Sequence, residues 1–400
     1  MARKAPALSP LAVCLAGALS LAVAMGIGRF AFTPMLPLMI RDGQIDLAAA
    51  GWVAAANYAG YLLGAMTASR IGWRAAVLAA AALLLTGALT AAMALPGSPW
   101  LWAGLRLLAG VCSAWAFVAT NVWCLSALAR LGRTSWSSVL YAGVGIGIAL
   151  AGAYCLAGAA AGATATALWL QLGLLALALT LPVAMVLRAV PIEAVHPASG
   201  VVAPPPAPGT AGLVVCYGVL GFGYILPATF LPVLARSVVQ DPRWFGLAWP
   251  VFGVTAAVST LMAGWWMRHR SRLQVWAVSN LLMGIGVLLP SLWLSGWTVG
   301  LSALLVGGTF MIVTMAGVQE IRSQAEGDAT ALLSRMTAAF ALGQIAGPVV
   351  ASLLLHLPLA GVNALDLALQ SGAATLLVSS LWLWRRAARR TGPEEVSPAG

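Results

Sequence analysis

Two stretches of this 400-residue chain, residues 134–187 and 273–319, contain no Asp, Glu, Lys or Arg. Each is at least twice as long as the roughly 20 apolar residues that carry a helix across a bilayer. The whole chain is 61% hydrophobic and 8% charged, with a mean hydropathy of +0.94. Soluble domains contain about 25% charged residues. We therefore predict an all-α membrane protein that crosses the bilayer many times.

The hydropathy along the chain predicts twelve transmembrane helices. Their expected bounds are residues 11–39, 47–68, 75–95, 100–127, 137–160, 165–187, 211–235, 245–267, 273–294, 297–318, 333–356 and 363–384.

Positive charges orient this pattern in the membrane. Arg41, Arg236 and Arg243 fall on the outer side when the N-terminus is cytoplasmic, and Arg29 and Arg106 fall within spans. The remaining sixteen of the 21 Lys and Arg then face the cytoplasm: Arg3, Lys4, Arg70, Arg74, Arg130, Arg133, Arg188, Arg268, Arg270, Arg272, Arg322, Arg335, Arg385, Arg386, Arg389 and Arg390. The positive-inside rule therefore predicts cytoplasmic N- and C-termini. This topology explains the net charge of +11 without a nucleic-acid partner, which would need a basic patch on a soluble domain.

The two halves of the chain share a sequence pattern. Residues 25–39 (MGIGRFAFTPMLPLM) align with residues 220–234 (LGFGYILPATFLPVL). This alignment pairs Gly26 with Gly221, Gly28 with Gly223, Leu36 with Leu231, Pro37 with Pro232, and Arg29 with Tyr224. At an offset of 200, Gly64 pairs with Gly264, Gly143 with Gly343, and Gly147 with Gly347. Two copies in the same orientation predict two six-helix bundles related by an axis along the membrane normal.

A proline-rich segment separates the two copies. Residues 190–210 (VPIEAVHPASGVVAPPPAPGT) lack helical periodicity and are typical of a flexible linker, which we place in the cytoplasm. We therefore expect an N-terminal bundle over residues 1–189 and a C-terminal bundle over residues 211–400. The second bundle ends in a short basic cytoplasmic tail.

Twelve spans in two sets of six, with a central cytoplasmic loop and both ends inside, resemble the major facilitator superfamily over essentially the whole chain. After span two, GAMTASRIGWR resembles the basic loop of that superfamily through Arg70, Gly72 and Arg74, with Ser69 or Ala68 in place of the usual aspartate. The resemblance implies that these three residues form a cytoplasmic gate.

Three further stretches carry the resemblance. In span four, LWAGLRLLAGVCSA resembles the superfamily's arginine motif through Arg106 and Gly110. In span eleven, GQIAGPVVAS resembles its glycine–proline motif through Gly343, Gly347 and Pro348, whereas GVGIGIALAG in span five lacks the proline. GIGRFAFTPMLPLM and AGWVAAANYAGYLLGA together resemble the bacterial YbfB/YjiJ branch. The resemblance implies a multi-pass transporter of the bacterial inner membrane, driven by protons, and it brings no substrate.

Arg29 lies inside the first predicted span, which is otherwise uncharged. A cation at that depth costs about 2.5–3.5 kcal/mol on insertion scales, and no carboxylate in the same span neutralises it. A guanidinium group can bind an anionic group through two parallel hydrogen bonds. We therefore predict that Arg29 binds an anionic part of the substrate, with a role in pinning helices as the alternative. Four neighbours are expected to act as packing or hinge residues: Gly26, Gly28, Pro34 and Pro37.

Other polar side chains within the spans are candidates for substrate binding or coupling, or for hydrogen bonds between helices. They are Asn57, Tyr58, Tyr61, Arg106, Asn121, Tyr141, Tyr217, Tyr224 and Gln344. A further set is expected to pack helices closely: Gly110, Gly143, Gly147, Gly343, Gly347 and Pro348.

Enzyme chemistry finds little support in the residues. Lys4 is the only lysine, so a Walker A loop or a Schiff-base lysine cannot lie in the core. The three histidines lie at loops or span ends, and the five cysteines lack the spacing of metal ligands. We therefore expect no enzyme, no metal and no other cofactor.

A secondary transporter that moves a small organic solute, anionic or amphipathic, by alternating access is the function these features favour. A sensor or scaffold that retains the transporter fold without transport is the alternative. None of the ten Asp and Glu lies in the middle of a span, so facilitated diffusion and anion exchange stay open beside proton coupling. The expected partners are the lipid bilayer and a small-molecule substrate, with the chain as a monomer.

Overall fold

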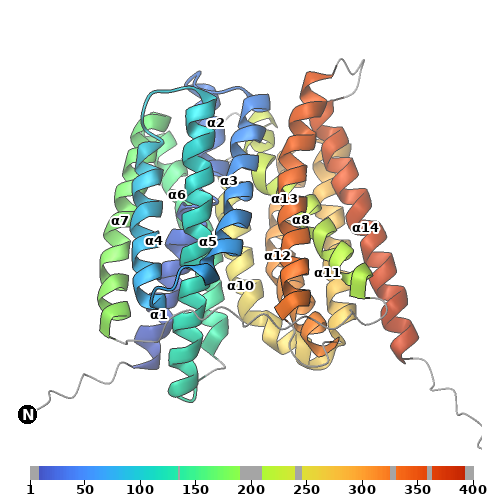
Figure 1. The fold of residues 1–400 in the computed structure, drawn as a ribbon. Coiled ribbons are helices and arrows are strands. Elements are labelled where there is room, and N and C mark those ends of the chain that lie inside the picture. The colour runs from blue at the N-terminus through green and yellow to red at the C-terminus, as the bar shows by residue number, and fades with distance from the viewer. Residues whose placement is uncertain are drawn as a thin grey trace, which may run out of the picture.

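The computed structural model describes residues 9–133, 136–189, 210–238, 246–324, 330–357 and 363–391. Every regular element within these ranges is a helix, as Figure 1 shows. The N-terminal half contains α1 (Pro10–Leu21), the π-helix η1 (Ala22–Ile27), α2 (Phe32–Arg41), α3 (Leu47–Thr67), the short 3-10 helix η2 (Ala68–Arg70), α4 (Ala75–Ala92), α5 (Pro99–Arg130), α6 (Ser137–Ala160) and α7 (Ala165–Ala189). The C-terminal half contains α8 (Thr210–Val238), α10 (Ala248–His269), α11 (Arg272–Leu292), α12 (Gly296–Gln324), α13 (Thr330–His356) and α14 (Ala364–Thr391).

The helices begin where the sequence supplies caps for their free backbone N–H groups. The Ser9 hydroxyl accepts from Ala12 N at the start of α1, and Asp46 accepts from Ala49 N at 2.7 Å at the start of α3. Ser98 precedes Pro99 at the start of α5, an arrangement that combines a capping hydroxyl with a proline at the first helical position.

The predicted spans coincide with helices to within a few residues. Ten helical stretches among the described residues are long and apolar enough to cross a membrane, with α1, η1 and α2 counted as one stretch. The other two predicted spans correspond to α3 and to α10, whose apolar described part is Ala248–Ala263. The structure therefore confirms that the described part of the chain is built of helices, many of them long and apolar enough to cross a membrane, and the number twelve stays a prediction.

The first span is not one continuous helix. Gly28 N and Phe30 N donate to carbonyls five residues back, Val23 O at 2.8 Å and Met25 O at 2.9 Å. The chain then makes a turn before α2 begins at Phe32, which places Pro34 in the first turn of α2, where its missing N–H does no harm. A π-helix of this kind is rare and commonly lies at functional sites.

The helices form two groups that correspond to the two halves of the sequence (Figure 1). Within the first half, α3 packs on α5 and α4 packs on α7; within the second, α11 packs on both α12 and α14, and α8 packs on α13. The halves meet mainly through α6 with α10 and α3 with α13, and also through α2 with α8. Residues 190–209 of the predicted linker lie outside the described residues, so the domain bounds stay a prediction.

Glycines allow α6 to approach the first span closely. A Cβ atom at Gly143 would overlap the Ala18 carbonyl, and one at Gly147 would overlap Ala22. Small residues that let helix backbones come together are the usual basis of helix association in membranes.

The same contact recurs in the second half, where Gly343 of α13 lies on the Gly218 carbonyl and Gly347 lies near Phe222 O. Gly218 and Phe222 lie 200 residues after Ala18 and Ala22, which make the matching contacts in the first half. The sequence alignment at offset 195, which pairs Arg29 with Tyr224, is therefore out of register with the packing. Glycine and proline recur along the first span and along α8, so sequence similarity alone tolerates a shift of five residues, about one and a half helical turns.

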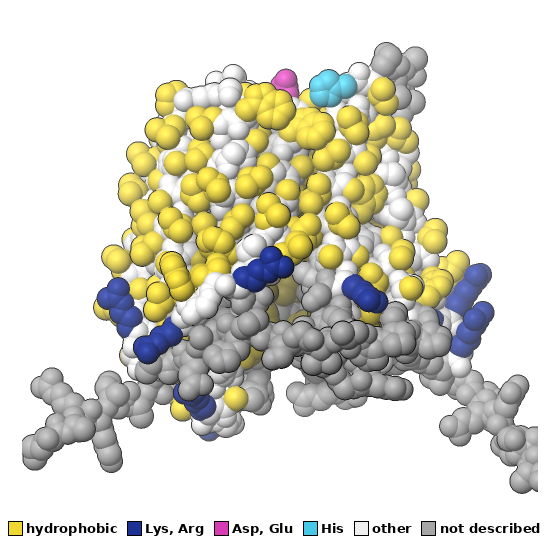
Figure 2. All heavy atoms as spheres, viewed as in Figure 1, with side chains coloured by type: hydrophobic (Ala, Val, Ile, Leu, Met, Phe, Trp, Pro, Cys, Tyr) yellow, Lys and Arg dark blue, Asp and Glu magenta, His cyan; other side chains and the backbone are white. Residues whose placement is uncertain are grey.

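The surface is a broad apolar belt with charges at its edges. On the face shown in Figure 2, Lys and Arg side chains gather toward the lower edge, where α1 begins and α14 ends, and an acidic and a His side chain lie at the upper edge. We call these the termini end and the outer end of the molecule. The distribution agrees with cytoplasmic termini, which stay a prediction.

Candidate functional site

Arg29 lies in the turn between η1 and α2 and is 4% exposed. Its Nη2 donates to the Gln344 side-chain oxygen on α13, and Gln344 donates in turn to the Tyr224 hydroxyl on α8. The guanidinium carbon lies 4.0 Å from the centre of the Tyr61 ring and 5.4 Å from that of Tyr58, both on α3. We call these five residues the central cluster. It joins the two halves of the chain.

Arg106 on α5 holds the backbone of the turn that carries Arg29. Its two terminal nitrogens donate to Gly28 O at 2.7 Å and Arg29 O at 2.5 Å. The break after η1 leaves these carbonyls without helical partners, and a buried carbonyl without a donor is costly. Asn57 on α3 donates to Arg106 O at 2.7 Å. In this structure Arg106 and Asn57 position the turn, and among the described residues neither makes a hydrogen bond to Gln344 or Tyr224.

Two residues that the sequence analysis did not single out also join the halves beside Arg29. The Thr33 hydroxyl of α2 donates to Ala228 O at 2.6 Å, and the Tyr58 hydroxyl lies 3.3 Å from the Thr229 hydroxyl. Thr33 and Thr229 carry no sequence signal beyond a hydroxyl in an apolar run. Their pairing depends on the relative placement of α2, α3 and α8.

Aromatic rings form the wall of the central cluster on the C-terminal side. The Tyr224 ring is stacked between Phe310 of α12 and Phe340 of α13, with centroid distances of 5.6 and 5.7 Å and interplanar angles of 4° and 9°. Phe252 of α10 stacks on Phe310 at 5.5 Å. Tyr217 contacts Phe340 at 5.1 Å. Together the rings form a packed aromatic wall, which Gln344 links to the Arg29 cation through the Tyr224 hydroxyl.

The positive charge of Arg29 has no described counter-ion. The single ion pair among the described residues joins Arg41 to Asp42, at the outer end. The Nε atom of Arg29 is buried and has no hydrogen-bond partner. A buried charge is normally paired, because removal from water is costly. The site therefore combines a guanidinium group that can accept an anion with aromatic surface for an apolar body.

The remaining predicted binding residues make their described contacts with groups other than Arg29. Asn121 donates to Phe117 O on its own helix at 2.8 Å, and the Tyr141 side chain on α6 is half-buried. Tyr217 is buried and packs edge-on against Trp276. Among the described residues, no group of three His, Cys, Asp or Glu lies together as a metal site requires.

The predicted packing residues lie at close helix approaches. Gly26 lies against the backbone of Gly147, and Gly110 lies against Asn57 O. A Cβ atom at Gly28 would overlap Thr86. Further along the interface between the halves, the Pro348 carbonyl lies against Gly51, and Pro37 lies within α2.

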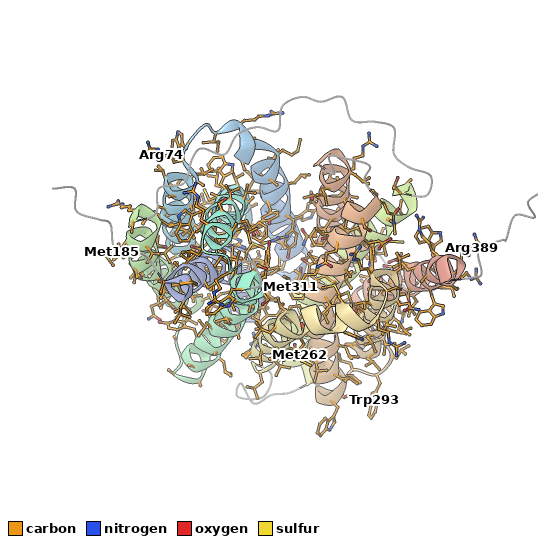
Figure 3. The ribbon with its side chains drawn as sticks, turned by 90° about the horizontal axis from the view of Figure 1, so that it is seen from below. Arg74, Met185, Met262, Trp293, Met311 and Arg389 are labelled. Carbon is orange, nitrogen blue, oxygen red and sulfur yellow. The ribbon has the colours of Figure 1, made fainter. Side chains whose placement is uncertain are left out.

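The predicted gate lies at the termini end. Arg70, in η2, and Gly72 and Arg74, in the turn that follows, are exposed. Within the described ranges, neither guanidinium group makes a hydrogen bond or ion pair with the C-terminal half. Figure 3, viewed from this end, shows Arg74 at the edge of the N-terminal half and Met311 near the centre of the molecule.

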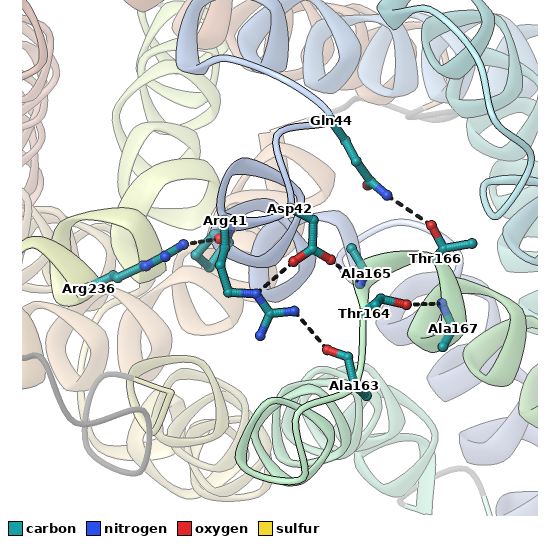
Figure 4. Close-up of polar contacts among 10 residues, drawn as sticks. Arg41, Asp42, Gln44, Ala163, Thr164, Ala165, Thr166, Ala167 and Arg236 are labelled. Atoms are coloured by element: carbon teal, nitrogen blue, oxygen red, sulfur yellow. Dashed lines mark hydrogen bonds and ion pairs between the residues drawn. The ribbon is translucent and has the colours of Figure 1, made fainter.

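At the outer end, in contrast, hydrogen bonds join the two halves. Arg236 at the end of α8 donates to the Pro37 carbonyl of α2 (Figure 4). On the other side of the interface, the Ser352 hydroxyl of α13 donates to Ala48 O of α3 at 2.9 Å.

Asp42 forms further hydrogen bonds at the outer end, within the N-terminal half (Figure 4). Its carboxylate accepts from Arg41 Nε at 2.7 Å and from Ala165 N at 2.6 Å, which caps α7, and Arg41 donates to Ala163 O. Burial alone would raise the pKa of Asp42, but these two hydrogen bonds, together with the positive charges of Arg41 and Arg236, outweigh it and lower the pKa below its usual value. The outer network therefore keeps its negative charge at neutral pH.

Solved transporters share this fold. The D-xylose–proton symporter is 13% identical, with 96% of this chain and 99% of that chain covered and a TM-score of 0.74. A mutant form of the nucleoside transporter NupG is 13% identical, with 93% and 99% covered and a TM-score of 0.72. A bacterial homologue of the human lysosomal transporter Spinster, in an inward-facing and unoccupied conformation, is 15% identical, with 96% of both chains covered and a TM-score of 0.65.

The fold is thus that of membrane transporters built from two helical halves. A family model described as the uncharacterised MFS-type transporter YbfB matches residues 21–384, and the chain belongs to this family of the major facilitator superfamily. The resemblance to the YbfB branch found in the sequence is confirmed. The comparison with curated proteins gives no match.

Proposed function

We propose that this chain is a secondary transporter that moves a small organic anion, with an apolar or aromatic body, across the bacterial inner membrane by alternating access. The family and the transporters of like fold support the transporter class. The observation that carries the substrate class is Arg29, a buried cation without a described counter-ion, at the junction of the halves and beside aromatic rings.

In this proposal the substrate anion binds Arg29 and replaces its contact with Gln344. Arg29 and Gln344 belong to opposite halves, so a ligand at this place contacts both and can favour one relative orientation over the other. The Tyr224 stack supplies apolar surface for the rest of the molecule. When no substrate is bound, the hydrogen bonds from Arg29 to Gln344 and from Gln344 to Tyr224 stabilise the buried charge of Arg29.

The described contacts fit a state that is closed at the outer end. Arg236 and Ser352 join the halves there, whereas Arg70 and Arg74 are exposed at the termini end. Under the predicted topology this is an inward-facing arrangement. Arg70, Gly72 and Arg74 would then form their contacts with the C-terminal half when the transporter turns outward.

The first step of the test is to identify a ligand. Thermal-shift screening of the purified chain against small carboxylates and phosphates identifies compounds that bind the folded state, because such ligands raise its apparent stability. The best compound, radiolabelled, is then offered to proteoliposomes that contain the chain. Saturable uptake above empty liposomes supports transport. Binding without uptake favours the alternative, a sensor or scaffold that retains the transporter fold.

The same proteoliposomes test whether transport is coupled to protons or to the exchange of a second anion. Uptake that depends on an imposed proton gradient supports proton coupling, as in the D-xylose–proton symporter of like fold. Uptake that instead requires unlabelled substrate on the opposite side supports anion exchange.

A further inference from the structure

A groove of about 450 Å³ lies on the surface of the C-terminal half, between α8 and α14. Val215 and Val219 of α8 and Val378 of α14 line it, and Val215 and Val378 are 62% and 69% exposed. The groove shares no residue with the central cluster. The residues that line the groove belong to the apolar belt that faces the bilayer, so we expect lipid hydrocarbon chains to fill it.

The groove is closed at the termini end by Trp382 of α14. The Trp382 ring lies against Gly212 of α8, where a Cβ atom would overlap it. Arg386 holds the ring in place, since its guanidinium carbon lies 5.3 Å from the ring centre and its Nη2 donates to Gln324 of α12 at 3.2 Å. Contacts among three helices therefore define this end.

Positive charge follows directly beyond the tryptophan. Val378, Trp382, Arg385 and Arg389 succeed one another at intervals of four, three and four residues, so they lie on one face of α14. Arg385 and Arg389 are exposed, and Figure 3 shows Arg389 at the edge of the C-terminal half. From Ala374 to Trp382 the helix rises about 12 Å, close to the thickness of the hydrocarbon in one leaflet.

We propose that the groove binds an acyl chain of one anionic phospholipid from the leaflet at the termini end, whose phosphate is bound by Arg385 and Arg389. The groove supplies an apolar slot of leaflet depth, and the two guanidinium groups lie where the head group of a lipid in that slot would be. Two basic residues near a membrane surface favour an anionic lipid about thirtyfold. This inference does not depend on the identity of the transported substrate.

The test is native mass spectrometry of the full chain, purified in detergent and titrated with phosphatidylglycerol or phosphatidylcholine. The wild type is expected to retain one phosphatidylglycerol about thirtyfold more tightly than phosphatidylcholine. The Arg385→Gln/Arg389→Gln double variant should lose this preference. Its matched control is Arg130→Gln/Arg133→Gln, which removes two exposed arginines at the same end of the N-terminal half and should keep it.

A second pair of variants tests the slot itself. Ala374→Phe fills the groove from an exposed position on α14, and Ala153→Phe adds the same ring to an exposed position on α6. Only Ala374→Phe should release the lipid. Equal binding of both lipids by the wild type, or full phosphatidylglycerol binding by Ala374→Phe, would overturn the proposal. So would a dimer that Ala374→Phe dissociates, because the groove would then be occupied by a second copy.

Discussion

Two arginines buried in the first half of the chain have different hydrogen-bond partners. Arg106 donates to two carbonyls at the break in the first span, whereas Arg29 extends across the interface to a side chain of the other half. Both are almost fully buried, at 1% and 4% exposure. Burial alone therefore does not separate the two arginines, and it is the different partners of Arg29 that support the proposal that it binds ligand.

This difference predicts unequal stability. Arg106→Ala leaves the carbonyls of Gly28 and Arg29 without donors, at about 1–3 kcal/mol for each buried group. Arg29→Ala removes a cation that has no counter-ion among the described residues and should destabilise the fold less. Thermal unfolding of the two purified variants in detergent measures the contrast. An Arg106→Ala variant as stable as the wild type would show that the turn does not depend on this arginine.

Helices can be predicted from the sequence more readily than the contacts between them. The spans were predictable because apolar runs and caps such as Asp46 and Ser98 act locally. The sequence also pointed to Arg29, since charge in an apolar run is conspicuous. The π-helix before it was not predictable, because the carbonyls it releases are satisfied by Arg106 from another helix. The pairing of Thr33 and Thr229 with the opposite half likewise has no local signal.

Close approach of α6 to the first span gives a prediction at the scale of the element. Gly147→Ala places a methyl group into the Ala22 backbone and should lower the melting temperature, as overpacking costs about 1–3 kcal/mol. Gly104, exposed on α5 with open space around it, is the matched control. Gly104→Ala should be neutral or stabilising, because alanine favours the helix. Equal effects of the two changes would contradict the packing described here.

At the scale of the whole molecule, the outer contact of Arg236 should bias the conformation. Arg236→Gln removes the donor to the Pro37 carbonyl and should raise the reactivity of a single cysteine at Ala48, where the carbonyl that accepts from Ser352 is kept, toward a water-soluble thiol reagent. Arg133→Gln, at the opposite end, should leave that reactivity unchanged. A cysteine that reacts at the wild-type rate in Arg236→Gln would show that this contact does not hold the outer end closed.

The orientation of the whole molecule is tested in intact cells. In a chain without Cys14, Cys112, Cys124, Cys155 and Cys216, single cysteines at Ser98 and Asn363 should react with an impermeant reagent from outside. A cysteine at Ser199, in the predicted linker, should not react, because the positive-inside rule places it in the cytoplasm. External labelling at Ser199 would reverse the topology.

The most direct measurement of the central claim is the affinity of one identified ligand for variants of Arg29. Loss of a charge-assisted contact costs about 1.5–3 kcal/mol, which is roughly a tenfold to hundredfold weaker Kd for Arg29→Gln. Arg29→Lys keeps the charge without the planar fork and should lose less. Tyr224→Phe removes only the hydroxyl that accepts from Gln344 and should have a mild effect. Stable Arg29→Gln protein with the wild-type Kd would contradict the account.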